Sequence, residues 1–168
     1  MAQMFERVAL IGLGLIGSSI AWASKRNDLA GEIVGYARSP ETRARAAELG
    51  FCDHIAESAV EAAKDADLVI VCVPVGVCGA VAAEIAPVLK PGAIVTDVGS
   101  TKRSMIDAMN PHLPSHVHFI PGHPMAGTEH SGPDSGFAEL YDNRWCILTP
   151  LDDSDPDALQ RLIDFWTG

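Results

Sequence analysis

Long apolar runs and an excess of positive charge are both missing from this sequence. No apolar run approaches the roughly 20 residues that a membrane-spanning helix needs, and residues 1–7 lack the order of a signal peptide. The 168 residues include 12 lysines and arginines against 22 aspartates and glutamates, which gives a formal net charge of -10. Because an acidic surface repels nucleic-acid phosphates, we expect neither a membrane nor a nucleic acid as partner.

Cysteine and metal-ligand patterns are also sparse. The four cysteines form no Cys-x-x-Cys pair, and Cys72 lies inside an apolar run, which predicts reduced thiols in a cytoplasmic protein. His116 and His118 would share one face of a strand, but they have no carboxylate or cysteine partner at ligand spacing. We therefore expect no metal site.

Apolar residues are plentiful, at 48% of the chain, and their pattern predicts one domain over residues 1–168. Short apolar runs typical of strands alternate with segments typical of helices, which predicts an α/β fold with a Rossmann-type, doubly wound, mostly parallel sheet. Strands are expected at residues 7–11, 33–36, 51–55, 68–73, 93–97, 117–120 and 145–148. Helices are expected at residues 15–26, 40–49, 57–64, 77–89, 104–109 and 156–166, and a loop at residues 121–136.

A Gly-x-Gly-x-x-Gly motif follows the first expected strand and opens the first expected helix. Gly12 would permit the tight turn, Gly14 the approach of a pyrophosphate, and Gly17 close packing of the helix on the strand. Leu15 and Ile16 begin the helix, where backbone N–H groups and the helix dipole favour phosphate. The motif predicts dinucleotide binding, and a purely structural turn is the alternative.

The end of the second expected strand distinguishes NAD from NADP sites. NAD sites usually carry an acidic residue there, but residues 35–39 contain none. Arg38 can pair with a 2′-phosphate and Ser39 can donate a hydrogen bond to it, while Arg43 and Arg45 lie nearby. This favours NADP over NAD. The alternative is a solvated basic surface beside an NAD site that lacks the acid.

Three further segments follow expected strands, so they should open at the same edge of the sheet. Val73 and Pro74 should lie along the cofactor. His123 stands in a glycine- and proline-rich stretch, and its imidazole suits proton removal near neutral pH. Ser100 can hydrogen-bond a substrate hydroxyl or cap the next helix, and Lys102 is either a surface charge or an anion contact.

Together these motifs resemble the prephenate/arogenate (cyclohexadienyl) dehydrogenase family, specifically its N-terminal nucleotide-binding domain. The first matching segment is generic to dinucleotide-binding proteins, whereas Gly-His-Pro-Met-Ala-Gly-Thr-Glu is specific, and the resemblance covers nearly the whole chain. The matching segments are residues 8–18, 95–102, 122–132 and 147–150.

The resemblance implies an NAD(P)-dependent oxidative decarboxylation of prephenate or arogenate in tyrosine biosynthesis. By the same resemblance, His123 takes the proton of the ring hydroxyl, Ser100 orients that hydroxyl, and Thr128 and Glu129 line the substrate pocket. The family's helical C-terminal domain, through which the full-length protein forms a homodimer, has no counterpart in these residues. We therefore expect a fragment that binds cofactor and turns over substrate poorly or not at all.

Two other functions fit parts of the pattern. One is another NADP-linked reductase of related architecture, such as a hydroxyacid or imine reductase, although those families place catalytic groups in the later helical domain. The other is a non-catalytic nucleotide-sensing module, which would keep the three glycines but would not need His123 and Ser100 to converge. A structure that places both side chains at one crevice favours the dehydrogenase.

Overall fold

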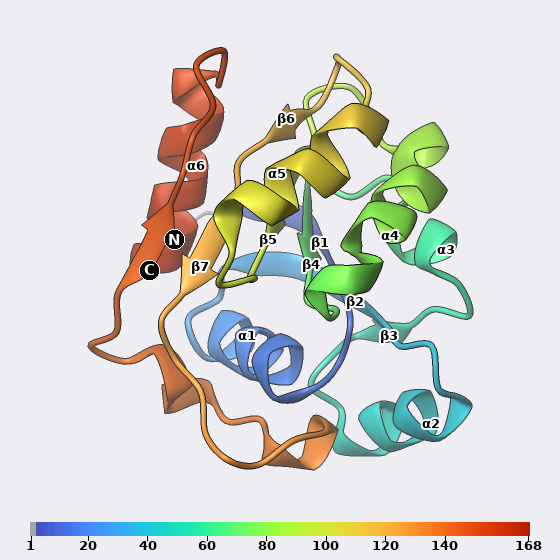
Figure 1. Cartoon of the computed structure of the whole chain (residues 1–168). Coiled ribbons are helices and arrows are strands. Elements are labelled where there is room, and N and C mark those ends of the chain that lie inside the picture. The colour runs from blue at the N-terminus through green and yellow to red at the C-terminus, as the bar shows by residue number, and fades with distance from the viewer. Residues whose placement is uncertain (1–2) are drawn as a thin grey trace.

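Six parallel strands form the centre of the molecule in this computed structural model, which describes residues 3–168 (Figure 1). Their order across the sheet is β3-β2-β1-β4-β5-β6, the order of a doubly wound fold, so the predicted fold class is confirmed. The strands are β1 (Phe5–Ile11), β2 (Ala30–Tyr36), β3 (His54–Ile55), β4 (Leu68–Val71), β5 (Ile94–Asp97) and β6 (His118–Phe119).

Helices cover both faces of this sheet. On one face α3, α4 and α5 pack against the strands, and on the other α1, α2 and α6 do so (Figure 1). Each face therefore has its own apolar core. The helices are α1 (Leu15–Arg26), α2 (Pro40–Leu49), α3 (Ala59–Ala63), α4 (Cys78–Ile85), α5 (Lys102–Met109) and α6 (Pro156–Thr167).

Alternate residues of the central strands enter alternate cores. In β1, Ala9 and Ile11 belong to the core under α3, α4 and α5, whereas Val8 and Leu10 belong to the opposite core. All four residues of β4 are 0% exposed. A parallel strand covered on both faces needs apolar side chains in both directions, which explains the continuous apolar runs in the sequence.

Helices α1 and α2 begin and end where the sequence predicts, whereas the other elements differ from their predicted ranges by a few residues at one or both ends. Helix α4 was expected to reach Leu89 and instead ends at Ile85, followed by a 3-10 turn over Ala86–Val88. Pro87 lies in that turn, and proline cannot donate the hydrogen bond that would continue an α-helix. Strand β4 was expected to reach Val73 but ends at Val71.

The segment that carries His123 also differs from the prediction of a loop. Gly122–Pro124 forms a short strand, β7, which pairs antiparallel with β8 (Cys146–Leu148) and sets His123 opposite Ile147. Its glycine and proline suggested a loop. The strand gave no local signal, because its pairing partner lies more than 20 residues further along the chain. After β7 the chain passes through 3-10 turns at Pro133–Ser135 and Ala138–Tyr141 that pack against α1.

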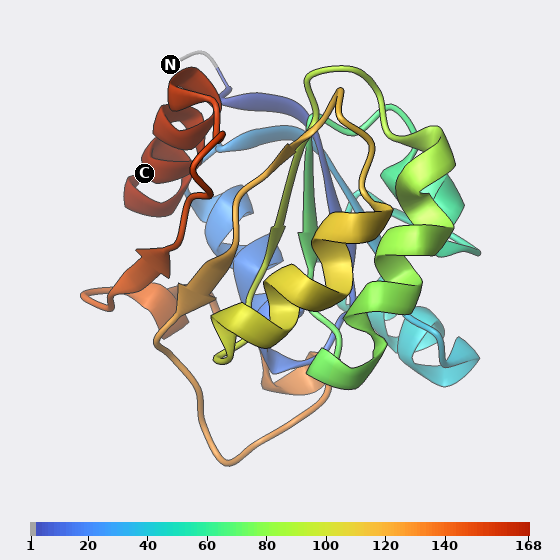
Figure 2. The same cartoon turned by 45° about the horizontal axis from the view of Figure 1, so that its top comes forward.

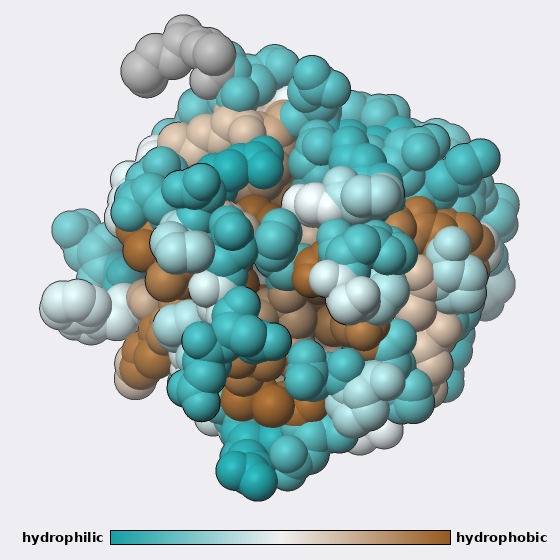
Figure 3. Space-filling model, turned by 90° about the horizontal axis from the view of Figure 1, so that it is seen from above, coloured by the Kyte–Doolittle hydropathy of each residue, from teal (hydrophilic) through white to brown (hydrophobic). Residues whose placement is uncertain are grey.

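Most of the outer surface is hydrophilic. Figure 3 views one end of the molecule, where hydrophilic side chains predominate and apolar side chains show between them, mainly in the middle of the view and along its right side. All four cysteines are free thiols. Among residues 3–168, no helix combines the length and the apolar character needed to cross a bilayer.

Candidate cofactor and catalytic site

The candidate residues follow strands that end at one edge of the sheet, the edge at which its parallel strands end. Strand β1 leads into Gly12, β4 into Val73, β5 into Ser100, and β6 leads through two residues into β7 and His123. This is the lower edge in Figure 2, toward which the central strands point. Ligands of open α/β sheets bind at this edge, and between β1 and β4, where the strand order reverses.

The glycine turn after β1 has the geometry that its motif predicts. Gly12 has φ +107°, and a Cβ atom there would lie 2.5 Å from the Cys72 carbonyl oxygen. A Cβ atom at Gly17 would lie 2.0 Å from the Gly12 carbonyl oxygen, so α1 packs directly on the turn. A Cβ atom at Gly14 would meet no atom of the described residues within 4 Å. Gly12 and Gly17 are therefore required by the fold, whereas Gly14 borders open space.

The start of α1 supplies donors to that open space. As its first three residues, Leu15, Ile16 and Gly17 have backbone N–H groups with no partner inside the helix. The first helical bond runs from Ser18 N to Gly14 O, at 3.0 Å. Amides at a helix N-terminus, aided by the helix dipole, favour an anion such as a pyrophosphate. The residues present therefore fit a dinucleotide at this turn.

A cavity of about 290 Å³ opens beside the turn, at the carboxyl ends of β1, β2 and β4. It brings together four residues predicted from the sequence, namely Gly12, Arg38, Val73 and Pro74. Its mainly apolar walls with a few polar groups at the rim are typical of a nucleoside site. The remaining lining residues are Ile11, Tyr36, Ala37, Ala59, Val77, Val81 and Glu84.

Ser39 is engaged by its own helix. Its Oγ accepts a hydrogen bond from Thr42 N (3.2 Å), which makes it the N-cap of α2, and donates one to Glu41 (2.6 Å). That bond is the main reason that the pKa of Glu41 lies below its usual value. The sequence suggested Ser39 as a phosphate donor. In the structure the hydroxyl of Ser39 donates its hydrogen bond to Glu41 instead. The carboxylate of Glu41 also brings a negative charge near the predicted phosphate position.

The other cations of this region differ in availability. Arg43 pairs with Glu57 (3.3 Å), and Arg45 pairs with Asp134 (2.6 Å). Arg38 is exposed and lines the cavity, and within residues 3–168 its side chain forms no ion pair. Of the three arginines proposed from the sequence, Arg38 is therefore the one positioned to meet a ligand.

His123 is half-buried in β7, and this strand is held at both ends by β8. Met125 N donates to Trp145 O (2.8 Å), and Thr149 N donates to Pro121 O (2.9 Å). The imidazole is therefore carried by a paired strand, which restricts its movement more than a free loop would.

Ser100 lies on the exposed turn between β5 and α5. The alternative role suggested for it, capping the helix, is wrong, because the N-cap of α5 is Thr101 and its side chain makes no capping bond within the described chain. The hydroxyl of Ser100 is thus left for another partner at the same edge.

Asp97 and Lys102 form an ion pair beneath these residues that sequence reasoning missed. Asp97 is 0% exposed and the Lys102 side chain 15% exposed. Lys102 Nζ contacts Asp97 Oδ2 and the Gly122 carbonyl oxygen, so Lys102 is neither a surface charge nor a free anion contact as predicted. The one signal in the sequence was an acidic residue at the end of an apolar strand, which needs a partner when buried.

Thr128 and Glu129 lie on the loop after β7, and both are exposed. Thr128 Oγ1 accepts a hydrogen bond from His130 N (3.2 Å), and Glu129 lies 3.5 Å from the His130 ring nitrogen. The structure therefore places these two predicted pocket residues on an open loop, with only local contacts.

The thiols near this edge are protonated. Burial raises the pKa of Cys72, and raises that of Cys78 to about 11 and that of Cys146 to about 12. A thiolate is the nucleophilic form of cysteine, so these residues are poor nucleophiles at neutral pH. His123 and Ser100 are left as the candidates for proton transfer.

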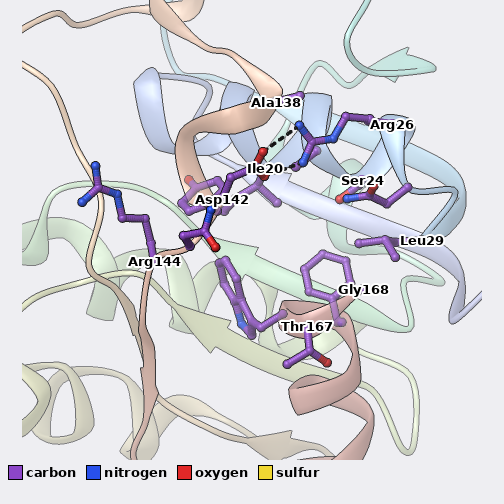
Figure 4. Close-up of a pocket in the computed structure, with 15 residues that line it drawn as sticks. Ile20, Ser24, Arg26, Leu29, Ala138, Asp142, Arg144, Thr167 and Gly168 are labelled. Atoms are coloured by element: carbon purple, nitrogen blue, oxygen red, sulfur yellow. Dashed lines mark hydrogen bonds and ion pairs between the residues drawn. The ribbon is translucent and has the colours of Figure 1, made fainter.

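A second cavity, of about 300 Å³, lies at the other end of α1 (Figure 4). Its rim includes the ion pair between Arg26 and Asp142 (2.6 Å), and Thr167 and Gly168 lie on its opposite side. Its lining residues on α1 are Ile20, Ala23, Ser24 and Arg26, and it shares no lining residue with the cavity beside the glycine turn, so the two are distinct.

Comparison with known proteins gives one consistent family. Residues 20–168 match the family model described as prephenate dehydrogenase, nucleotide-binding domain. A cyclohexadienyl dehydrogenase of Zymomonas mobilis is 43% identical over 163 residues, which cover 97% of this chain and 55% of the relative. A prephenate dehydrogenase of Bacillus subtilis is 38% identical over 169 residues, covering 100% of this chain and 46% of the relative.

Solved structures agree. Prephenate dehydrogenase from A. aeolicus in complex with hydroxyphenyl propionate and NAD+ is 31% identical, with a TM-score of 0.88, over 96% of this chain and 56% of that one. The Synechocystis arogenate dehydrogenase is 30% identical, with a TM-score of 0.86, over 95% of this chain and 55% of that one. The chain thus spans about half the length of the relatives it matches.

Proposed function

The chain belongs to the prephenate dehydrogenase family, and on that premise we propose that it is the cofactor-binding part of an NAD(P)-dependent dehydrogenase that oxidatively decarboxylates prephenate, arogenate or both. The substrate is a cyclohexadienol, and the product of its oxidation and loss of carbon dioxide is aromatic. Such a reaction belongs to tyrosine biosynthesis.

One observation carries this proposal. The glycine turn, Ser100 and His123 follow strands that end at one edge of one sheet, so the residues that would hold a cofactor and the two candidate catalytic residues share that edge. A non-catalytic nucleotide sensor has no need of an imidazole and a hydroxyl there. The relatives named as dehydrogenases support the same function.

The residues of this chain divide the chemistry between them. A dinucleotide held at the glycine turn would supply the acceptor for the hydride that leaves the carbinol carbon of the substrate. His123 takes the proton from the hydroxyl on that carbon as the carbonyl forms, and Ser100 orients the hydroxyl toward the imidazole. Loss of carbon dioxide from the ring carbon opposite leaves its electron pair in the ring, which becomes a phenolate, and His123 returns the proton to give the phenol. Thr128 and Glu129 border the substrate.

We further propose that the cofactor is NADP in preference to NAD. The end of β2 offers no carboxylate for a ribose 2′-hydroxyl, whereas the exposed guanidinium of Arg38 lines the cavity. Glu41 opposes this preference because it stands near the same position. The proposed cofactor site comprises Gly12, Gly14, Leu15, Ile16, Gly17, Arg38, Ser39, Val73 and Pro74.

Cofactor preference is measured by titrating the chain with NADPH and NADH and following nicotinamide fluorescence. We expect tighter binding of NADPH, and a loss of about 10- to 100-fold in its affinity in Arg38→Ala, because a charge-assisted hydrogen bond to phosphate contributes about 1.5–3 kcal/mol. Arg144→Ala, which changes an exposed arginine outside the cavity, is the matched control. Tighter binding of NADH that Arg38→Ala leaves unchanged would reject the NADP preference.

The dehydrogenase itself is tested in a chimera of residues 1–168 with the C-terminal half of the Zymomonas mobilis relative. With prephenate and NADP, or NAD if the titration favours it, we expect turnover, and a fall in kcat of about 100-fold or more in His123→Asn, the range for loss of a general base. His112→Asn, an exposed histidine on another turn, should leave kcat unchanged. Near-normal kcat in His123→Asn would remove His123 as the base. The 168-residue chain alone should bind cofactor with little or no turnover.

A further inference from the structure

We propose that Asp97 and Lys102 are positioning residues that fix Ser100 and His123 relative to one another through a single buried ion pair. The proposal rests on the function proposed above, because it concerns the two residues given the catalytic roles. It assigns no contact with substrate to either member of the pair.

The Asp97 carboxylate binds both segments that carry the candidate catalytic residues. Its Oδ2 accepts a hydrogen bond from Gly99 N at 2.9 Å, in the turn that bears Ser100. Its Oδ1 accepts one from Gly122 N at 3.2 Å, in the strand that bears His123. Each catalytic candidate is therefore the immediate neighbour of a backbone amide held by the same carboxylate.

Lys102 completes the arrangement from the other side. Its Nζ contacts Asp97 Oδ2 and also the carbonyl oxygen of Gly122. The N–H of Gly122 is held by Asp97 and its C=O by Lys102, so both peptide planes next to Gly122 are fixed. The second of these planes is the one that leads into His123, so the pair sets the direction in which this residue leaves the strand.

The close approach of β7 to β5 is a second, independent observation. A Cβ atom at Gly122 would lie 3.0 Å from the Asp97 carbonyl oxygen and 3.1 Å from Thr96 Oγ1. A side chain at this position would push β7 away from β5 and lengthen the bonds to the pair. Glycine before His123 thus allows the contact on which the positioning depends.

Because the pair is buried, its contacts are needed for stability, which is not the case for an exposed ion pair. Asp97 is 0% exposed, so its charge must be matched by donors, and the two amides and Lys102 supply them. Removing one partner leaves an unmatched buried charge, and such a variant loses stability for that reason alone. The test must therefore remove both charges together.

The decisive variant is the double change Asp97→Asn with Lys102→Met, in the 168-residue chain without cofactor. Amide hydrogen exchange is followed by NMR at Gly99, Gly122 and the core residue Val69, together with the ring signals of His123. The matched control is Asp67→Asn with Lys90→Met, a pair of the same chemistry (2.6 Å) at the opposite edge of the sheet.

We expect the amides of Gly99 and Gly122 to exchange about tenfold faster or more, relative to Val69, in the Asp97/Lys102 double variant, because local opening then precedes global unfolding. The His123 ring signals should shift or broaden. In the control pair, exchange at Gly99 and Gly122 should change only in step with Val69, and the His123 signals should stay in place. If the Asp97/Lys102 variant behaves as the control does, the pair is merely stabilising and the proposal is overturned.

Should the double variant not fold, Lys102→Arg replaces it, because it keeps the buried charge paired while moving the donor atoms. We expect displaced Gly122 and His123 signals with unchanged core signals, and unchanged signals at all three sites overturn the proposal. None of these measurements involves turnover or cofactor. If the proposed function is wrong, the exchange and NMR results still test the positioning role. If the positioning role is wrong, the proposed function is unaffected.

Discussion

At the scale of single residues, the glycines after β1 lie in different surroundings although they belong to one motif. Gly12 adopts φ +107°, a conformation that side chains disfavour, and Gly17 lies against the Gly12 carbonyl oxygen. Gly14 has φ -79°, which any residue adopts, and a Cβ atom there meets nothing in the described chain within 4 Å. The fold therefore explains the first and third glycines, and a ligand is needed to explain the second.

This difference predicts a separation of stability from binding. Gly17→Ala should lower the thermal midpoint by several degrees, since overpacking costs about 1–3 kcal/mol, and weaken cofactor binding as well. Gly14→Ala should leave the midpoint unchanged or slightly raised, yet weaken NADPH or NADH binding by about tenfold or more, because the methyl group occupies the pyrophosphate position. Thermal unfolding and fluorescence titration measure the two effects. Unchanged affinity in Gly14→Ala would show that the open space there does not hold the ligand.

Single residues also mark the limit of what the sequence predicts. The spacing of the glycines is local, so their roles in the turn were predictable from the motif. Asp97 at the end of an apolar run signals a need for a partner, and Lys102 lies five residues away. The bond from Gly122 to Asp97 depends on a strand 25 residues further along the chain, which no local pattern encodes. Ser39 follows Arg38, which lines the cavity, but its use as the N-cap of α2 competes with the predicted phosphate contact in a way that only geometry reveals.

At the scale of secondary-structure elements, Asp67 fastens the start of β4 to its neighbours. Its side chain accepts a hydrogen bond from Arg7 N (2.9 Å) at β1 and pairs with Lys90 (2.6 Å) before β5. Burial acts to raise its pKa, but the bonds from Lys90 and Arg7 outweigh burial and hold the pKa below its usual value. A carboxylate whose folded pKa is lowered stabilises the protein above the ordinary Asp range and loses that contribution as pH falls.

Asp67→Asn should therefore lower the free energy of unfolding by about 1 kcal/mol at pH 7, the typical value of a hydrogen bond. The difference from the unchanged chain should shrink as the pH falls below about 4, where Asp67 becomes protonated in the unfolded and then in the folded chain. Urea unfolding at pH 7 and pH 3 measures both values. Asp107→Asn, which alters an exposed pair on α5, serves as control, and a difference independent of pH would contradict the assignment.

The secondary-structure elements were predicted best where the signals for their start and end lie within the segment itself. Helices α1 and α2 carry their own start and stop signals, including Pro40 at the beginning of α2 and Gly50 in the left-handed conformation at its end. Strand β7 was missed because three residues with glycine and proline have little strand propensity of their own. It forms because β8 pairs with it and β5 contacts it, which is tertiary information.

At the scale of the whole molecule, the alternation of strands and helices was sufficient to predict the doubly wound sheet and the shared edge at which the strands before the candidate residues end. Parallel strands covered on both faces are mostly apolar, so β1, β4 and β5 stand out in the sequence. The path of residues 125–142 was not predictable, because it is set by contacts with α1, such as the bond from Tyr141 Oη to Ile16 O (2.9 Å).

The position of β1 in the middle of the sheet also bears on how the protein is made. Ile11 O accepts from Cys72 N (2.7 Å), and the Cys72 carbonyl lies over Gly12, so the first motif to leave the ribosome is completed by a strand translated some 60 residues later. Domains generally emerge N-terminus first, and contacts distant in sequence form late. A nascent chain arrested before β4 has left the exit tunnel should therefore fail to retain dinucleotide, although every glycine of the motif has already been synthesised.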